Sequence, residues 1–358
     1  YIICLEVSII LSVLLDVHFR WIMKIEDLER FDPQRMYQTY DKWPTYSENA
    51  FKKEFSKIQL QDIDHVVLAG MGGSGAIGDV ISAILSREDI HVSNIKGYLL
   101  PKTVDERTLV ISTSISGNTK ETLSILDYKS KSKAKFVAIS SGGMMKEKCV
   151  KNSITHYDIG MIHSPRASFT TFLYSIINIF EDVLPIQRTE VFESFEKMNK
   201  LQEKINSNNL EDDNPSLNLA RKINSSPLIY YPDGLKAAAI RFKNSLQENA
   251  KIHASVEDII EASHNSVSTW ENENDLKPIL LQGVNDFLKT KERWDIVKEY
   301  FKSRNIEYEE VFSVEGGIIS KLVCLIYLLD YTSVYLAVLS KTDPSPVTAI
   351  DFIKSRLK

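Results

Sequence analysis

The stretch from His65 to Ser86 constrains the fold of this 358-residue chain more than any other. It reads HVVLAG, then MGGSGAIGD, then VISAILS, so an apolar run stops at Gly70 and an apolar, periodic segment resumes at Ile77. This order predicts a strand, a glycine-rich turn and a helix. The first backbone N–H groups of such a helix lack partners, and together with the helix dipole they form a site for an anion above the strand.

A second loop of the same kind runs from Ser112 to Thr119, with the sequence STSISGNT, directly after the apolar run Thr108–Ile111. Serine, threonine and glycine at two strand ends predict a phosphate held by hydroxyls and backbone amides. The sequence has no closely spaced set of histidines, cysteines or carboxylates with the spacing of metal ligands. We therefore expect neither a metal ion nor another cofactor.

The rest of the chain alternates short apolar runs with helical patterns, and a chain of this length suits two domains. Apolar strands at this rhythm imply crossover connections. The sequence thus predicts an α/β fold with two related units, each a parallel sheet flanked by helices on both faces. The predicted strands are 64–70, 94–100, 108–113, 135–140, 154–159, 227–231, 252–256, 277–282 and 306–311. The predicted helices are 76–86, 118–130, 145–150, 168–183, 234–248, 257–263, 287–302, 318–340 and 347–357.

Changes of composition suggest where the units divide. Residues 197–216 are polar and charged, and Pro215 marks a boundary. We expect the functional chain to begin at Met23, with the preceding residues either a loosely attached extension or an upstream translation artefact. The expected organisation is 1–22 as this doubtful extension, 23–58 as amino-terminal helices, 59–190 as the first unit, 191–215 as helix and linker, and 216–358 as the second unit with the carboxyl-terminal helix.

Two apolar stretches raise the question of a membrane. Residues 1–22 contain three charged side chains, and their longest uncharged run, Val7–Leu15, is too short to span a bilayer. The segment Leu322–Leu339 is nearly continuous apolar sequence, but Asp330 interrupts it. A charge at the centre of a bilayer costs about 3 kcal/mol on insertion scales. We therefore expect a helix buried in a protein core, and no membrane partner.

Charge and cysteine usage exclude other classes. The net charge of −5 and the lack of a basic stripe with interleaved aromatic residues argue against a nucleic-acid partner. The 3 cysteines lie far apart in the sequence, which argues against a disulfide framework or a zinc site. A cytoplasmic protein is expected, because free cysteines are typical of a reducing compartment.

The glycine loop alone admits other interpretations. Gly70, Gly72 and Gly75 satisfy the G-x-G-x-x-G pattern of dinucleotide-binding folds, but those folds place an acid at the end of the second strand. Here the second predicted strand ends at Gly97–Pro101 without an acid, and no Lys-Ser or Lys-Thr pair follows the glycines as in a P-loop. A simple tight turn remains possible. The hydroxyl-rich loop 112–119 instead favours a small phosphorylated ligand.

Five motifs in order resemble one known family. They are GMGGSGAIGD, SISGNT followed by ET, SPR at 164–166, RFKNSLQENAK at 241–251, and EASHN around His264. The chain resembles the sugar-isomerase (SIS) fold and, more narrowly, the bifunctional phosphoglucose/phosphomannose isomerases of archaea and some bacteria. The resemblance runs from about Met23 to the carboxyl end. It implies reversible isomerisation of glucose 6-phosphate and mannose 6-phosphate to fructose 6-phosphate, through a cis-enediol and without a metal, by a homodimer.

The resemblance also implies roles for individual residues. Arg166 would stabilise charge on the enediol, and Glu248 would move a proton between C1 and C2. His264, contributed by the partner subunit, would open the sugar ring. A lysine on the last helix would assist at the ring oxygen, with Lys354 preferred over Lys358. The residues expected to hold the substrate phosphate are Gly73, Ser74, Ser114, Ser116 and Thr119.

The local sequence adds physical content to some of these roles. Glu248 has Leu246, Ala250 and Ile252 as apolar neighbours, and burial among them would suit a carboxylate that shuttles a proton. Taken alone, however, Glu248 reads as an exposed glutamate at a helix end and His264 as a surface histidine. Catalytic roles for Glu248 and His264 are favoured only because the phosphate loops occur in the same chain. Arg166 follows Pro165, where a fixed guanidinium can face an oxyanion, although a plain surface arginine is the alternative.

The sequence departs from the family pattern at two places. The common N-H-N-E around the histidine is S-H-N-S here, so the acidic neighbour is missing. Ser345 stands in the D-P-S-P turn where many members have threonine. This second change bears on the balance between mannose and glucose substrates rather than on the reaction. The alternative function is a non-catalytic SIS module that senses a sugar phosphate and regulates a partner.

Overall fold

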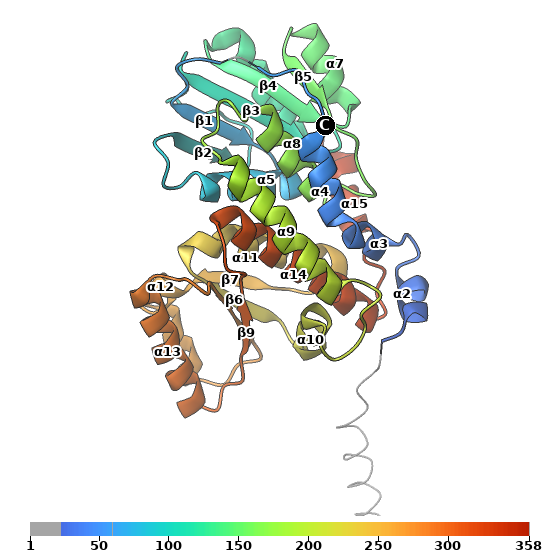
Figure 1. Ribbon diagram of the computed structural model, residues 1–358, viewed down its shortest axis with the longest axis vertical. Helices are drawn as coiled ribbons and strands as arrows, with labels where there is room; N and C mark the ends of the chain where they lie inside the picture. Colours follow the sequence, from blue (N-terminus) through green and yellow to red (C-terminus); the bar gives the residue numbers. More distant parts are fainter. Residues whose placement is uncertain (1–22, 59, 358) are drawn as a thin grey trace, which may run out of the picture.

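The computed structural model describes residues 23–58 and 60–357, so the expected extension 1–22 and the alternative lysine Lys358 lie outside the described residues. Figure 1 shows two sheets, one above the other, with helices between them and on their outer faces. The first sheet contains β1 (His65–Ala69), β2 (His91–Ile95), β3 (Thr108–Ser114), β4 (Lys135–Ser140) and β5 (Thr155–Asp158). The second sheet contains β6 (Pro227–Tyr231), β7 (Ser255–Asp258), β8 (Lys277–Gln282) and β9 (Glu309–Phe312).

Both sheets are parallel throughout and follow one pattern. The strand orders are β2-β1-β3-β4-β5 and β7-β6-β8-β9, so in each sheet the first strand in sequence lies inside, between the second and the third. The predicted α/β fold of two parallel sheets flanked by helices is confirmed. In the first sheet the strand order reverses between β1 and β3, because β2 is added on one side of β1 and β3 on the other, and here Ala69 pairs with Ser112. Ligands of such sheets bind at this kind of switch point, outside the carboxyl ends of the strands.

The helices connect these strands and form the amino- and carboxyl-terminal segments. Before the first sheet come α2 (Ile25–Phe31), α3 (Met36–Asp41) and α4 (Trp43–Lys52). With the first sheet belong α5 (Gly72–Ile84), α6 (Lys120–Ile125), a 3₁₀ helix (Leu126–Lys131), α7 (Gly143–Lys151) and α8 (Phe169–Ile179). Next come α9 (Arg188–Ile205), α10 (Pro215–Lys222), a 3₁₀ turn (Asp233–Leu235), α11 (Lys236–Ser245) and a π-helix (Leu246–Ala250). The last are α12 (Ile259–Ala262), a 3₁₀ helix (Ser266–Glu271), α13 (Leu288–Ser303), α14 (Ile318–Leu339) and α15 (Thr348–Arg356).

Alternating residues of the central strands face different cores. In β1, Val66 and Leu68 contribute to the large core between the two sheets, whereas Val67 and Ala69 face a smaller core on the outer face of the first sheet. The second sheet does the same, since Ile229 of β6 belongs to the large core and Tyr230 belongs to a separate outer core. Because strand side chains alternate between faces, strands covered on both sides read as continuous apolar runs.

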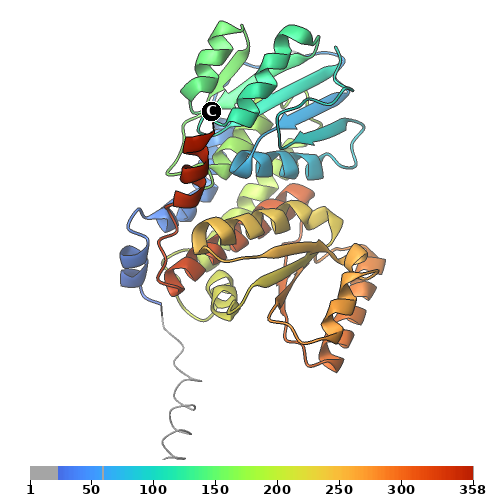
Figure 2. The ribbon, with the colours of Figure 1, turned by 180° about the vertical axis from the view of Figure 1, so that it is seen from behind.

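The long apolar helix α14 lies in the large core. Its 22 residues are long and apolar enough to cross a membrane, but 89% of its most apolar 18-residue window is buried inside the protein. It packs beside α9, α10 and α11, and Figures 1 and 2 show it between the two sheets. Asp330, halfway along, is 0% exposed. The prediction of a buried core helix is confirmed.

Some element bounds differ from the predicted ones. Strand β2 covers His91–Ile95 rather than 94–100, because its pairing with β1 begins at His91 opposite His65 and ends at Ile95. Pro215 does not lie in a linker but begins α10, where its fixed φ suits the first helical turn. The predicted helix 234–248 is instead α11 followed by a π-helix that ends at Ala250.

The amino end of α14 is capped from another helix. Glu193, on α9, accepts hydrogen bonds from the backbone N–H of Gly317 at 2.8 Å and from the hydroxyl of Ser320 at 2.9 Å. The Gly317 hydrogen bond is the main cause that lowers the pKa of Glu193 below its ordinary value of 4.5. A negative charge at this end is also favoured by the dipole of the helix.

We expect Glu193→Gln to lower the free energy of unfolding by about 1 kcal/mol at pH 7. Because the pKa of Glu193 is lower in the folded state, its stabilisation is present above pH 4.5 and is lost as the pH falls through the folded value. The stability difference between wild type and variant should therefore shrink as urea denaturation is repeated at decreasing pH below that point. Glu196→Gln, an exposed neighbour on α9, should change little at any pH. An equal difference at all pH values would contradict this role.

Candidate active site

Two loops meet at the switch point of the first sheet, as the sequence predicts. One follows β1 and leads into α5, and the other follows β3 and leads into α6. The hydroxyl of Ser74 accepts a hydrogen bond from the backbone N–H of Ile115 at 3.1 Å, so the two loops are joined directly. Within the second loop, Ser114 donates to the hydroxyl of Thr119 at 3.0 Å, and the hydroxyl of Ser116 accepts from Asn118 N–H at 3.4 Å.

The glycine loop lies against the segment that carries Arg166. A β-carbon at Gly73 would lie 3.4 Å from the carbonyl oxygen of Pro165 and 3.5 Å from the Cα of Arg166. These distances are ordinary van der Waals contacts, so the two segments lie directly against each other. The predicted phosphate-binding residues and Arg166 are thus brought to one place, although they come from three separate segments of the chain.

Arg166 is buried, with 6% of its surface exposed, and the second half of the chain surrounds its guanidinium. Its Nε donates to Oδ1 of Asn249 at 2.6 Å, and its Nη2 donates to the carbonyl oxygens of Pro344 and Ser345 at 2.5 and 2.9 Å. Its Nη1 lies 3.5 Å from Oε2 of Glu248. The plain surface arginine is excluded, and the two residues expected to act on the enediol face each other.

Glu248 differs from the lone buried carboxylate that its apolar neighbours in sequence predict. Its side chain is 25% exposed, and it is paired with Arg166. Glu248 lies on the π-helix Leu246–Ala250, which directly continues α11. Lys251 then takes a left-handed conformation, with φ 59°, and its Nζ donates to the carbonyl oxygen of Glu248 at 2.5 Å. Burial, assisted by the charge of Arg166, lowers the pKa of Lys251.

His264 and Lys354 lie away from this pair. His264 is exposed in the turn after α12, and Lys354 is exposed on α15. Figures 1 and 2 show α12 and α15 on opposite sides of the protein. Helix α15 lies near the phosphate loops, because Nζ of Lys120, at the start of α6, donates to the carbonyl oxygen of Leu357 at 2.5 Å. A single chain therefore does not bring His264 and Lys354 to one side of the molecule.

Comparison with known proteins gives the family. A family model described as the bacterial phospho-glucose isomerase C-terminal SIS domain matches residues 212–357. The chain is also 31% identical over 309 residues to the bifunctional phosphoglucose/phosphomannose isomerase of Caldicellulosiruptor bescii. The aligned region covers 84% of this chain and 91% of that protein. The chain belongs to this isomerase family. The protein of the same name from Aquifex aeolicus is 29% identical over 315 residues, covering 87% of this chain and 95% of that protein.

The fold is shared with solved structures. The C-terminal domain of glucosamine-fructose-6-phosphate aminotransferase from Francisella tularensis superposes with a TM-score of 0.63 at 18% identity, covering 86% of this chain and 96% of that chain. This likeness concerns the fold alone. The predicted family and the predicted enzyme class, an isomerase, are confirmed by the relatives above.

A buried network in this isomerase binds the backbone of Arg166, and it was not predicted from the sequence. Arg241, on α11, donates from Nη2 to the carbonyl oxygen of Arg166 at 2.9 Å, and its Nε and Nη2 donate to Oδ2 of Asp330 at 3.0 and 2.5 Å. The guanidinium also lies 4.0 Å from the centre of the Phe169 ring. The sequence carried one signal of this network. Asp330 interrupts the apolar run of α14, and a charged residue inside an apolar helix requires a buried partner.

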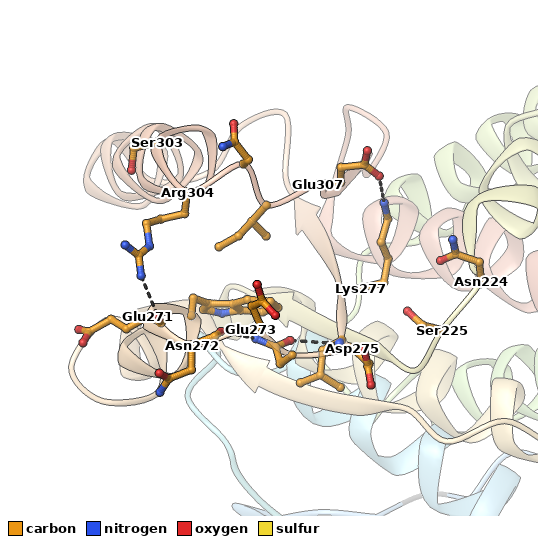
Figure 3. Close-up of a pocket in the computed structure, with 15 residues that line it drawn as sticks. Asn224, Ser225, Glu271, Asn272, Glu273, Asp275, Lys277, Ser303, Arg304 and Glu307 are labelled. Carbon is orange, nitrogen blue, oxygen red and sulfur yellow. Dashed lines mark hydrogen bonds and ion pairs between the residues drawn. The ribbon is translucent and has the colours of Figure 1, made fainter.

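The isomerase also has a polar hollow far from these residues. A cavity of about 960 Å³ opens at the amino ends of β8 and β9, the opposite end from that where ligands of parallel sheets bind. In Figure 3, Lys277 points toward Glu307, and Arg304 reaches the backbone of Glu271. None of the predicted site residues lines this cavity. The large volume of this cavity therefore does not mark the candidate active site.

Proposed function

We propose that this protein reversibly interconverts glucose 6-phosphate, mannose 6-phosphate and fructose 6-phosphate through a cis-enediol. One observation carries the proposal: the Gly73 loop, the Arg166 segment and Glu248 form a continuous series of contacts, from the loop proposed to bind the phosphate to a carboxylate. Each of these came from a different motif. The names of the family members in Caldicellulosiruptor bescii and Aquifex aeolicus support the choice of substrates.

In this proposal the phosphate is an anchor. The hydroxyls of Ser74, Ser114, Ser116 and Thr119, together with the first N–H groups of α5 and the backbone of Gly73, hold it at the carboxyl ends of β1 and β3. Binding energy gained at the phosphate, which does not react, then positions C1 and C2 of the sugar for reaction. A sugar without the phosphate should lose this positioning.

Glu248 is the proposed base. It removes the proton from C2 of the aldose, the electron pair of that C–H bond forms the C1=C2 double bond, and the carbonyl oxygen on C1 gains negative charge and then a proton. Return of a proton to C1, with loss of a proton from the C2 hydroxyl, gives the ketose. The Nη1 of Arg166, already 3.5 Å from Glu248, lies where it can stabilise the negatively charged oxygen.

Ring opening is proposed to need a second subunit. The exposed position of His264, on the side of the protein away from α15, supports a homodimer in which His264 of the partner subunit reaches the sugar ring. Lys354, on α15 beside the phosphate loops, is the proposed group at the ring oxygen. Two buried free thiols, Cys149 and Cys324, support a reducing, cytoplasmic setting.

Ser345 is the proposed determinant of the balance between C2 epimers. Its backbone carbonyl accepts from Arg166, whereas its hydroxyl is buried and makes no hydrogen bond to a described residue. We propose that this unpartnered hydroxyl binds a substrate oxygen. Serine in place of threonine keeps that group and removes one methyl.

The test is turnover of purified protein on glucose 6-phosphate and mannose 6-phosphate, side by side, with formation of fructose 6-phosphate followed in a coupled assay. Turnover of both substrates supports the proposal. Tight binding of sugar phosphates without turnover would instead favour the sensing module, and turnover of only one substrate would restrict the proposal to that epimer.

We expect the activity to persist in excess EDTA, because the proposed route uses a carboxylate, a guanidinium and a histidine in place of a Lewis acid. In the described ranges 23–58 and 60–357, no group of three His, Cys, Asp or Glu side chains is placed to hold a metal ion. Turnover is measured before chelation, after it, and after adding back Mg²⁺, Mn²⁺ or Zn²⁺. Loss on chelation with recovery on adding back a metal would contradict the enediol route without metal.

A further inference from the structure

We propose that Asn249 is a positioning residue, which fixes the guanidinium of Arg166 in the orientation that the enediol requires. This role rests on the proposed function. Asn249 is the residue after the proposed base, and it is fully buried, at 0% exposure. Its side chain is directed at Arg166, which belongs to the first half of the chain.

Both the oxygen and the nitrogen of the Asn249 side-chain amide make hydrogen bonds. Oδ1 accepts from Nε of Arg166 at 2.6 Å, and Nδ2 donates to the hydroxyl of Ser333 at 2.8 Å. That hydroxyl in turn donates to the carbonyl oxygen of Asp330 at 2.6 Å. Because the Ser333 hydroxyl donates onward, it must accept from the amide nitrogen. The amide oxygen is therefore the atom that faces Arg166.

The guanidinium is consequently held along one edge. Nε is bound by Asn249 and Nη2 by the carbonyl oxygens of Pro344 and Ser345, while Nη1 is the nitrogen that faces Glu248. The backbone of Arg166 is held as well, by Arg241. Of these contacts, the Asn249 hydrogen bond is the only one from a described side chain to the guanidinium apart from the Glu248 pair.

This arrangement couples the base to the guanidinium. Glu248 and Asn249 are consecutive residues of the π-helix, so the same turn presents the base and orients the group that stabilises the enediol. Removal of the Asn249 amide frees Nε and leaves Nη2 as the only nitrogen of that edge with a partner, so the orientation of the guanidinium is less tightly fixed. Phosphate binding, at Ser74, Ser114 and Thr119, should not depend on it.

The experiment is a double-mutant cycle on turnover, with Asn249→Ala, Arg166→Ala and the double variant. We expect Asn249→Ala to lower kcat roughly 10- to 100-fold with little change in KM, and Arg166→Ala to lower it roughly 100- to 1000-fold. In the Arg166→Ala background, Asn249→Ala should have almost no further effect, because its action passes through the missing guanidinium. Asn249→Ser provides the same comparison if Asn249→Ala does not fold.

A matched control separates positioning from stability. Asn178, at the carboxyl end of α8, is also buried, at 6% exposure, and its amide bridges the carbonyl oxygen of Lys53 and Nζ of Lys57. Asn178→Ala should lower the melting temperature but leave kcat nearly unchanged in both backgrounds. Equal factors for Asn249→Ala with and without Arg166 would overturn the positioning role alone. Absence of turnover in the wild type would overturn the proposed function, and this role with it.

Discussion

Replacement of Glu248 by glutamine is expected to lower kcat by roughly 10²- to 10⁴-fold, because the amide cannot accept the proton from the sugar carbon. Glutamine has nearly the shape of glutamate, so Arg166 should largely keep its position. The affinity for fructose 6-phosphate, measured by calorimetry, should therefore stay close to that of wild type. Turnover is measured in the coupled assay.

The control for this variant is Glu203→Gln, which makes the same chemical change at an exposed site on α9. It should turn over substrate as wild type does. If Glu248→Gln keeps wild-type turnover, Glu248 is not the base. If Glu248→Gln loses turnover and affinity together, the residue contributes to binding rather than to proton transfer.

Replacement of Asp330 by alanine is expected to lower the free energy of unfolding by about 3–5 kcal/mol, since it leaves the buried charge of Arg241 without its partner. Burial raises the pKa of Asp330 above the ordinary carboxyl value, while Arg241 opposes that rise. The hydrogen bond from Ser245 to Oδ1 at 2.7 Å is lost as well. Denaturation with urea, followed by circular dichroism, measures the change.

The combined change Arg241→Met with Asp330→Leu provides the comparison. Replacing both charges with apolar groups of similar size removes the unpaired charge, so the double variant should be more stable than Asp330→Ala. Stability of Asp330→Ala within about 1 kcal/mol of wild type would show that the ion pair between Arg241 and Asp330, despite its short distance of 2.5 Å, does not anchor α11 to α14.

Strands covered on both faces could be predicted from the sequence, and the edge strand β2 could not. Strands β4, β6 and β8 have the predicted bounds, because each is a short apolar run between polar or turn residues. In contrast, β2 lies at the edge of its sheet and only Ile95 in it is buried. Its pattern carries little hydrophobic signal, and its register with β1 sets its bounds.

The site also has parts that could be predicted from the sequence and parts that could not. The two loops that carry hydroxyls are local in sequence and could be predicted, whereas the pairing of Arg166 with Glu248 depends on how the two sheets pack against each other. Asn249 and Arg241 lie in the motif that was singled out, but their partners lie far away in the sequence, on other elements. The unit boundaries at 190 and 215 and the place of His264 in a dimer stay predictions.

The most direct test of the account is a crystal structure of the protein with fructose 6-phosphate bound. The account predicts the phosphate within hydrogen-bond distance of the hydroxyls of Ser114 and Thr119, and C1 and C2 of the sugar beside the carboxylate of Glu248. A phosphate bound away from those hydroxyls, or a sugar whose carbonyl end lies far from Glu248, would contradict it.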